Sequence, residues 1–89
     1  IALTKSLAIE FARNRIRVNC VVPAHVQTEM AQTLKSSLTE SQFKHIEEMH
    51  PLGIGHPRDV AMAIAFLLSD ASKWITGTSL VVDGGYTAH

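Results

Sequence analysis

The feature that most constrains how this chain folds is a short valine-rich segment, which comes soon after a segment with helical periodicity. Residues 1–13 carry apolar side chains four positions apart, which predicts a helix with one apolar face. Residues 17–22 then predict a strand that Pro23 ends, because proline has no amide hydrogen for a neighbouring strand. Adjacent valines in this segment favour a strand covered on both faces. A helix, a very short connection and such a strand are typical of a wound α/β sheet.

The rest of the chain adds a weak helical region, a strong helix and a second strand. Residues 28–50 have a polar and interrupted helical pattern, with a capping box that starts at Thr39, which predicts a peripheral flap. Pro57 suits the first position of a strongly amphipathic helix. Residues 79–82 predict a short strand, and a turn over residues 83–85 closes it. Two strands joined by such a crossover are expected to be parallel.

Composition limits the number of domains and the classes of partner. A chain of 89 residues, 46% hydrophobic and 18% charged, fits one globular domain at most. Eight basic and eight acidic residues cancel and form no basic stripe, so neither nucleic acid nor a membrane surface is expected as a partner. No apolar run approaches the roughly 20 residues that span a bilayer. The lone Cys20 cannot form an internal disulfide, which is compatible with the cytoplasm.

Four short motifs occur in order along nearly the whole chain. They are L-T-K-S-L-A at residues 3–8, I-R-V-N at residues 16–19 followed by Pro23, P-L-G with P-R-D-V-A and F-L-L-S-D within residues 51–70, and I-T-G with V-D-G-G within residues 75–85. Together they resemble the C-terminal third of classical short-chain dehydrogenases/reductases, and most of all the 3-oxoacyl-carrier-protein-reductase-like group. The resemblance implies an α/β fold, the C-terminal portion of a Rossmann-like doubly wound parallel sheet in the order helix, strand, flap, helix, strand.

The resemblance gives the segment after the first strand a role in cofactor binding. In this family that segment holds the carboxamide of the nicotinamide ring, and the matching groups are the backbone of Val26 and the hydroxyl of Thr28. Pro23 would line the ring, and Ala24 stands beside it where the family usually has glycine. The flap over residues 28–50 would be a lid over the substrate. From the residues alone, Thr28 also suits the N-cap of the following helix, and both roles stay open.

The function implied by the resemblance is interconversion of a carbonyl and an alcohol, on a small-molecule substrate, by hydride transfer with NAD or NADP. The sequence has no glycine-rich phosphate turn, no matching catalytic Ser and no Tyr-x-x-x-Lys pair. Ile1 stands at the position of the tyrosine, so Lys5 is not the family's lysine. We therefore expect residues 1–89 to be the C-terminal fragment of a single Rossmann-like domain, with no catalytic residue, no tight cofactor binding and no activity alone.

An alternative function is a non-catalytic module that acts through self-association. A two-stranded parallel sheet would leave apolar surface open, which predicts a homo-oligomer. The surface expected to be buried is either the open sheet edge or the helix face of Val60, Ile64 and Leu67. The five histidines lack the paired spacing of a zinc site, so no metal site is expected. The glycine pair 84–85 leads into no helix and predicts a turn, not a phosphate loop.

Overall fold

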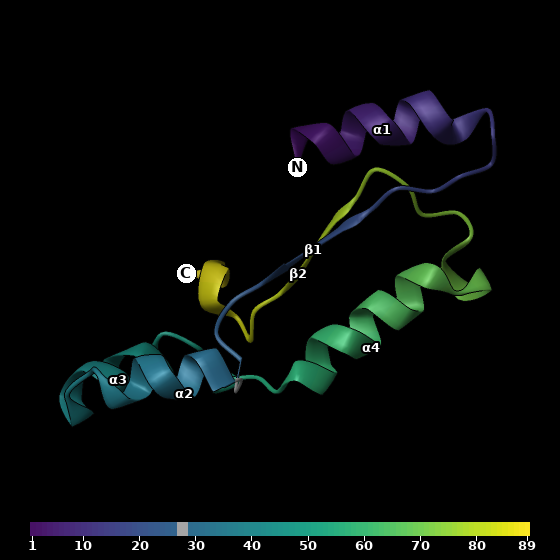
Figure 1. Ribbon diagram of the computed structural model, residues 1–89. Helices are drawn as coiled ribbons and strands as arrows, with labels where there is room; N and C mark the ends of the chain where they lie inside the picture. The colour runs from purple at the N-terminus through teal and green to yellow at the C-terminus, as the bar shows by residue number, and fades with distance from the viewer. Residues whose placement is uncertain (27–28) are drawn as a thin grey trace.

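The computed structural model of the chain describes residues 1–26 and 29–89. At its centre are two parallel strands, β1 (Cys20–Pro23) and β2 (Ser79–Val82), which are far apart in the sequence and adjacent in space (Figure 1). The register pairs the first residue of β1 with the first of β2, and the last with the last. Both strands therefore end at the same edge, and the predicted parallel pairing is confirmed.

Two helices flank the strand pair. α1 (Ala2–Ala12) and α4 (Pro57–Leu68) lie on opposite sides of it in Figure 1. Two short 3₁₀ helices, η1 (Asp70–Ser72) and η2 (Tyr86–Ala88), follow α4 and β2. α4 packs against both strands, and its Leu67 is only 8% exposed. Helices on both sides of parallel strands are the arrangement of a doubly wound sheet, so the predicted fold class is confirmed.

The predicted flap consists of two short helices at the carboxyl end of β1 (Figure 1). They are α2 (Glu29–Ser36) and α3 (Glu40–Glu48), and Thr39 is the N-cap of α3, as the predicted capping box requires. The capping box is formed: Thr39 Oγ1 accepts the Gln42 amide at 3.1 Å, and Gln42 Oε1 accepts the Thr39 amide at 2.8 Å. These two bonds satisfy amides that the first turn of a helix otherwise leaves unpaired.

Replacing Thr39 with alanine is expected to lower the stability of α3 by about 1 kcal/mol, because the Gln42 amide loses its acceptor. Amide hydrogen exchange over residues 40–43 should accelerate accordingly. Thr33→Ala is the matched control, since the Thr33 hydroxyl only donates to the Glu29 carbonyl of its own helix. Equal exchange over residues 40–43 in both variants would contradict this role of Thr39.

β1 begins three residues later than predicted, at Cys20 instead of Arg17. The segment before it is held by a side chain. Asn19 Oδ1 accepts the Thr78 amide at 3.0 Å, and Asn19 Nδ2 donates to the Ile75 carbonyl at 3.1 Å. A side chain here satisfies backbone groups that a longer strand would pair through its own main chain, and this shortens the regular strand.

The helix face that was predicted to bind a second copy is used within the chain. Leu67 is buried, Val60 is half-buried and Ile64 is 43% exposed, while α4 packs on both strands. The prediction of an open face is therefore wrong for Leu67, because the sheet already covers it. The more exposed apolar side chains at this end are Leu68 (78%) and Trp74 (96%).

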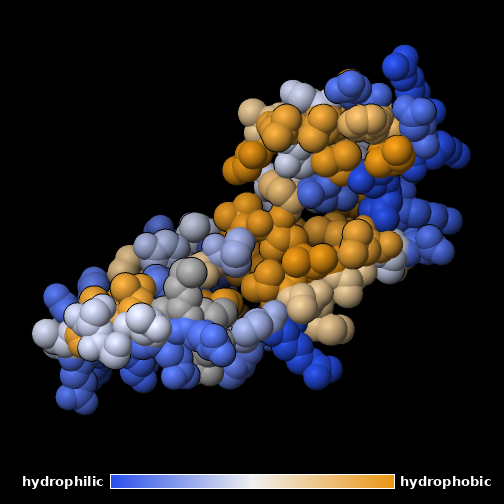
Figure 2. All heavy atoms as spheres, viewed as in Figure 1, coloured by the Kyte–Doolittle hydropathy of each residue, from blue (hydrophilic) through white to orange (hydrophobic). Residues whose placement is uncertain are grey.

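Figure 2 shows apolar surface gathered over α1, α4 and the region between them, whereas the flap is mostly polar. No helix within the described ranges is long and apolar enough to cross a membrane.

Candidate functional site

The carboxyl ends of β1 and β2 form one side of a surface recess. Pro23 and Ala24 line the recess from the β1 side, and Asp83, Tyr86 and Thr87 line it from the β2 side. Its volume is about 300 Å³. In open parallel sheets ligands bind outside the carboxyl ends of the strands, so this recess is where a ligand is expected.

The backbone of Val26 presents a donor and an acceptor next to this edge. Val26 forms an isolated parallel bridge with Gly55, in which the His25 carbonyl accepts the Gly55 amide at 3.1 Å. The bond is made by His25, so the amide and carbonyl of Val26 itself point away from Gly55. Within the part of the chain that the structure describes, neither group of Val26 has a hydrogen-bond partner. One N–H and one C=O on a single residue match the two polar groups of a primary amide.

Of the other predicted cofactor residues, the structure describes Pro23 and Ala24 but not Thr28. Pro23 is exposed at the last position of β1, and Ala24 is half-buried directly after it. Among the described residues, Arg15 is the only non-glycine with a positive φ, at 61°. Ala24 therefore adopts a backbone conformation that does not require glycine. Thr28 lies outside the described residues, so its hydroxyl and its capping role stay predictions.

The loop between α3 and α4 is hydrogen-bonded to the segments that follow β1 and β2. The Gly55 amide bonds to the turn after β1, and the Leu52 amide donates to the Gly84 carbonyl at 2.9 Å. Gly85 has a φ of 95°, and a Cβ there would stand 3.0 Å from the Pro51 ring, so both backbone conformation and space favour glycine. The predicted turn after β2 is confirmed, and it helps to fix the loop.

Asp83 organises this turn. Its Oδ1 accepts the Gly85 amide at 2.9 Å, and its Oδ2 accepts the Thr87 hydroxyl at 2.6 Å and the Thr87 amide at 2.9 Å. The bond from the Thr87 hydroxyl is the main reason why the pKa of Asp83 lies below its ordinary value. The Asp83 carboxylate thus accepts the Gly85 and Thr87 amides, so these two amides are not free to bind a phosphate.

Thr87→Val is expected to raise the pKa of Asp83 toward its ordinary value, because valine keeps the shape and the amide but loses the hydroxyl. A depressed pKa contributes stability above the unfolded-state pKa, and this stability is lost as pH falls through the folded-state pKa. The variant should therefore lose part of that contribution near neutral pH. A carboxyl NMR titration measures the shift, with Tyr86→Phe as the neighbouring control. An unchanged pKa of Asp83 in Thr87→Val would contradict the assignment.

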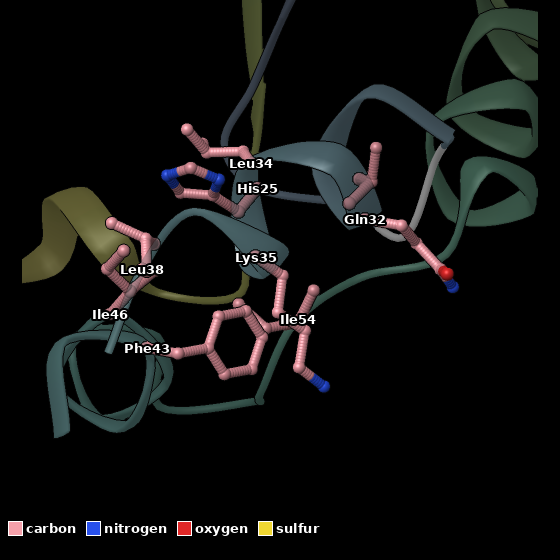
Figure 3. A pocket seen from close by; sticks show the side chains of 9 residues that line it. His25, Gln32, Leu34, Lys35, Leu38, Phe43, Ile46 and Ile54 are labelled. Atoms are coloured by element: carbon pink, nitrogen blue, oxygen red, sulfur yellow. The ribbon is translucent and has the colours of Figure 1, made fainter. Parts of the chain in front are cut away.

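A small apolar pocket lies between the flap and the Val26 segment. Its volume is about 100 Å³. Figure 3 shows side chains from α2, α3 and the loop before α4 around it, with His25 beside Leu34. At its rim, the Lys35 Nζ stands 4.5 Å from the centroid of the Phe43 ring. The apolar side chains that line the pocket are Val26, Leu34, Leu38, Phe43, Ile46 and Ile54.

The histidines form no metal site within residues 1–26 and 29–89, where no group of three metal-binding side chains occurs. One of them nevertheless has a structural role that the sequence did not indicate. His50 is buried at the end of α3, with both ring nitrogens in hydrogen bonds. Its two neighbours in the sequence, Met49 and Pro51, give no sign of this, because one of its partners is 25 residues away.

Parallel strands with helices on both sides define the class: the C-terminal part of a Rossmann-like sheet. A family model described as enoyl-(acyl carrier protein) reductase matches residues 1–87. The chain is 47% identical over 88 residues to 3-oxoacyl-(acyl-carrier-protein) reductase of Chlamydia pneumoniae, covering 98% of the chain and 34% of that relative. It is 39% identical over 87 residues to cyclohexanol dehydrogenase of Acinetobacter sp. strain SE19, covering 97% and 32%.

Solved structures agree with these relatives. A short chain dehydrogenase family protein from Francisella tularensis superposes with a TM-score of 0.87 at 38% identity, covering 99% of the chain and 40% of that structure. A 4-hydroxyisoleucine dehydrogenase complexed with NADH superposes with a TM-score of 0.90 at 36% identity, covering 99% and 36%. The chain belongs to the short-chain dehydrogenase/reductase family, as its motifs predicted. It spans about a third of the length of the curated relatives named above.

Proposed function

We propose that residues 1–89 are the C-terminal part of an NAD(P)-dependent oxidoreductase that interconverts a carbonyl and an alcohol by hydride transfer. The observation that carries this proposal concerns Val26, next to the carboxyl ends of the parallel strands in a chain of this family. Among the described residues, its amide and carbonyl have no hydrogen-bond partner. A related dehydrogenase of the same fold is complexed with NADH, which supports a nicotinamide cofactor.

The proposed cofactor contact is made by the main chain. The amide and carbonyl of Val26 would hold the carboxamide of the nicotinamide, and Pro23 and Ala24 would line its ring. The cofactor supplies the hydride, and the face that reacts depends on how the carboxamide is held. Thr28 would add a hydroxyl to the same group. The Val26 backbone suits the carboxamide because it offers one hydrogen-bond donor and one acceptor, which match the acceptor and donor of a planar primary amide.

The flap is proposed to be the lid over a small carbonyl or alcohol substrate. Its support is the apolar pocket of about 100 Å³, which the two flap helices and Val26 line together. A lid of this kind excludes water from the reacting groups when it closes. The relatives differ in the substrates that their names state, a 3-oxoacyl-(acyl-carrier-protein) in one and cyclohexanol in another.

Residues 1–89 alone are proposed to be inactive, because they contain neither a Tyr-x-x-x-Lys pair nor a glycine-rich phosphate turn. The test compares the intact protein with residues 1–89. The intact protein should oxidise NADH or NADPH with members of a panel of ketones and aldehydes, and residues 1–89 should show no dinucleotide binding by calorimetry. Tight dinucleotide binding by residues 1–89, or no turnover by the intact protein with any member of the panel, would refute the proposal.

We also infer that the protein is a cytoplasmic homo-oligomer. The support is the exposed apolar surface at and after the end of α4, at Leu68 and Trp74, and a lone cysteine that forms no internal disulfide. Light scattering on the intact protein tests the assembly, and a stable monomer in dilute solution would contradict it. Cofactor binding by the intact protein separates the enzyme from the alternative of a non-catalytic, self-associating module.

A further inference from the structure

His50 is the one titratable side chain that is buried within the described residues, with 3% of its surface exposed. Residues within the described part of this chain bury it. Its Nδ1 lies 2.7 Å from the Ile46 carbonyl oxygen in the last turn of α3. Because a carbonyl only accepts hydrogen bonds, this contact assigns the ring proton to Nδ1.

The second nitrogen of His50 completes the same assignment. With the proton on Nδ1, Nε2 of a neutral ring has a free lone pair, and it accepts the backbone amide of His25 at 3.5 Å. The two contacts lie on opposite sides of the ring and require the same tautomer. The ring also stacks near Tyr86, with centroids 4.8 Å apart, and meets the His25 ring edge-on at 5.6 Å.

His25 is held at both of its backbone groups by one loop. Its amide donates to the His50 ring, and its carbonyl accepts the Gly55 amide at 3.1 Å. The loop is itself fixed, because the Gly53 amide donates to the His50 carbonyl at 2.7 Å and the Leu52 amide donates to the Gly84 carbonyl. His25, the residue immediately before Val26, is therefore held by hydrogen bonds to two residues of a loop that is itself fixed.

We propose that His50 is a positioning residue for the cofactor turn. The Nε2 of its imidazole accepts the His25 amide, which sets the direction of the Val26 backbone and ties the end of the flap to that backbone. Only the consequence of this role, the effect on nicotinamide binding, rests on the proposed function. The hydrogen bond itself is a property of the described residues.

Two variants of the intact protein separate the hydrogen bond from the filling of space. His50→Gln keeps an acceptor near the position of Nε2 but loses the ring, whereas His50→Phe keeps a ring against Tyr86 but has no acceptor. In His50→Phe, hydrogen exchange at the His25 amide should be roughly fivefold faster and the KM for the cofactor roughly fivefold higher. In His50→Gln, both quantities should stay within about twofold of the wild type. A side chain that only fills space would give the opposite order.

A nitrogen-15 NMR spectrum of the imidazole gives a readout that needs no variant. The proposal expects the His50 ring to carry its proton on Nδ1, and a proton on Nε2 would overturn it. A His50→Phe protein that matches the wild type in both exchange and cofactor KM would also overturn it. Absence of cofactor binding by the wild-type intact protein would instead refute the proposed function, while the NMR and exchange data would still decide the His50 contact.

Discussion

Replacing Arg17 with methionine is expected to lower the free energy of unfolding by about 2 kcal/mol. The Arg17 guanidinium binds the end of α4: Nη1 donates to the Leu67 carbonyl at 2.8 Å and to Ser72 Oγ at 3.0 Å, and Nη2 donates to the Ser69 carbonyl at 3.3 Å. The last carbonyls of a helix have no partner within the helix. Methionine keeps the apolar stem of the side chain and removes all of these donors.

The effect should be large for a single side chain because the acceptors are partly out of water. Ser72 is 1% exposed and Leu67 is buried, so an acceptor that loses Arg17 gains little hydration in return. Urea denaturation of the intact protein, followed by circular dichroism, measures the loss. Arg17→Lys should recover only part of it, since an ammonium group cannot reach several acceptors in the fixed fork of a guanidinium.

Arg13→Met is the matched control, because Arg13 is exposed at the end of α1. It should change the free energy of unfolding by no more than about 0.5 kcal/mol. If Arg17→Met and Arg13→Met are equally stable, the guanidinium does not contribute to the end of α4, and the connection between β1 and α4 must be held by packing alone.

The sequence predicted the elements whose signals are local. Thr39 and Gln42 lie three residues apart and cap α3 as predicted, and Pro57 begins α4 at the predicted position. The start of β1 was missed because Arg17 and Asn19 bind groups 50 or more residues further along the chain. Such bonds leave no periodic pattern in the sequence, so the length of the strand cannot be obtained from propensity.

The same distinction applies to the site. The position of Val26 followed from the resemblance to the family, but the direction of its backbone groups depends on a bridge to Gly55, 29 residues away. His50 was seen as one of several scattered histidines, because its contacts with His25 and Tyr86 are made only in the folded chain. Ala24 stands where the family usually has glycine, and its backbone conformation does not require one.

Replacing Val26 with proline is expected to lower kcat/KM of the intact protein for the nicotinamide cofactor by about 100-fold. Proline removes the amide hydrogen that the proposed function assigns to the carboxamide of the cofactor. The bridge to Gly55 should survive, because its hydrogen bond runs from the Gly55 amide to the His25 carbonyl and does not use the Val26 amide. The residue before a proline favours extended backbone, which suits a position next to a bridge.

Val26→Ala is the control that keeps the amide and removes most of the side chain. It should reduce kcat/KM by no more than about fivefold, because it changes packing in the apolar pocket but leaves the proposed donor in place. Steady-state kinetics with NADH and NADPH, and a thermal melt of each variant, give the comparison. A folded Val26→Pro protein with the activity of Val26→Ala would show that the main-chain amide of Val26 does not hold the cofactor. Since Thr28 is the other polar group proposed for the same carboxamide, Thr28→Val would then be expected to carry the larger loss.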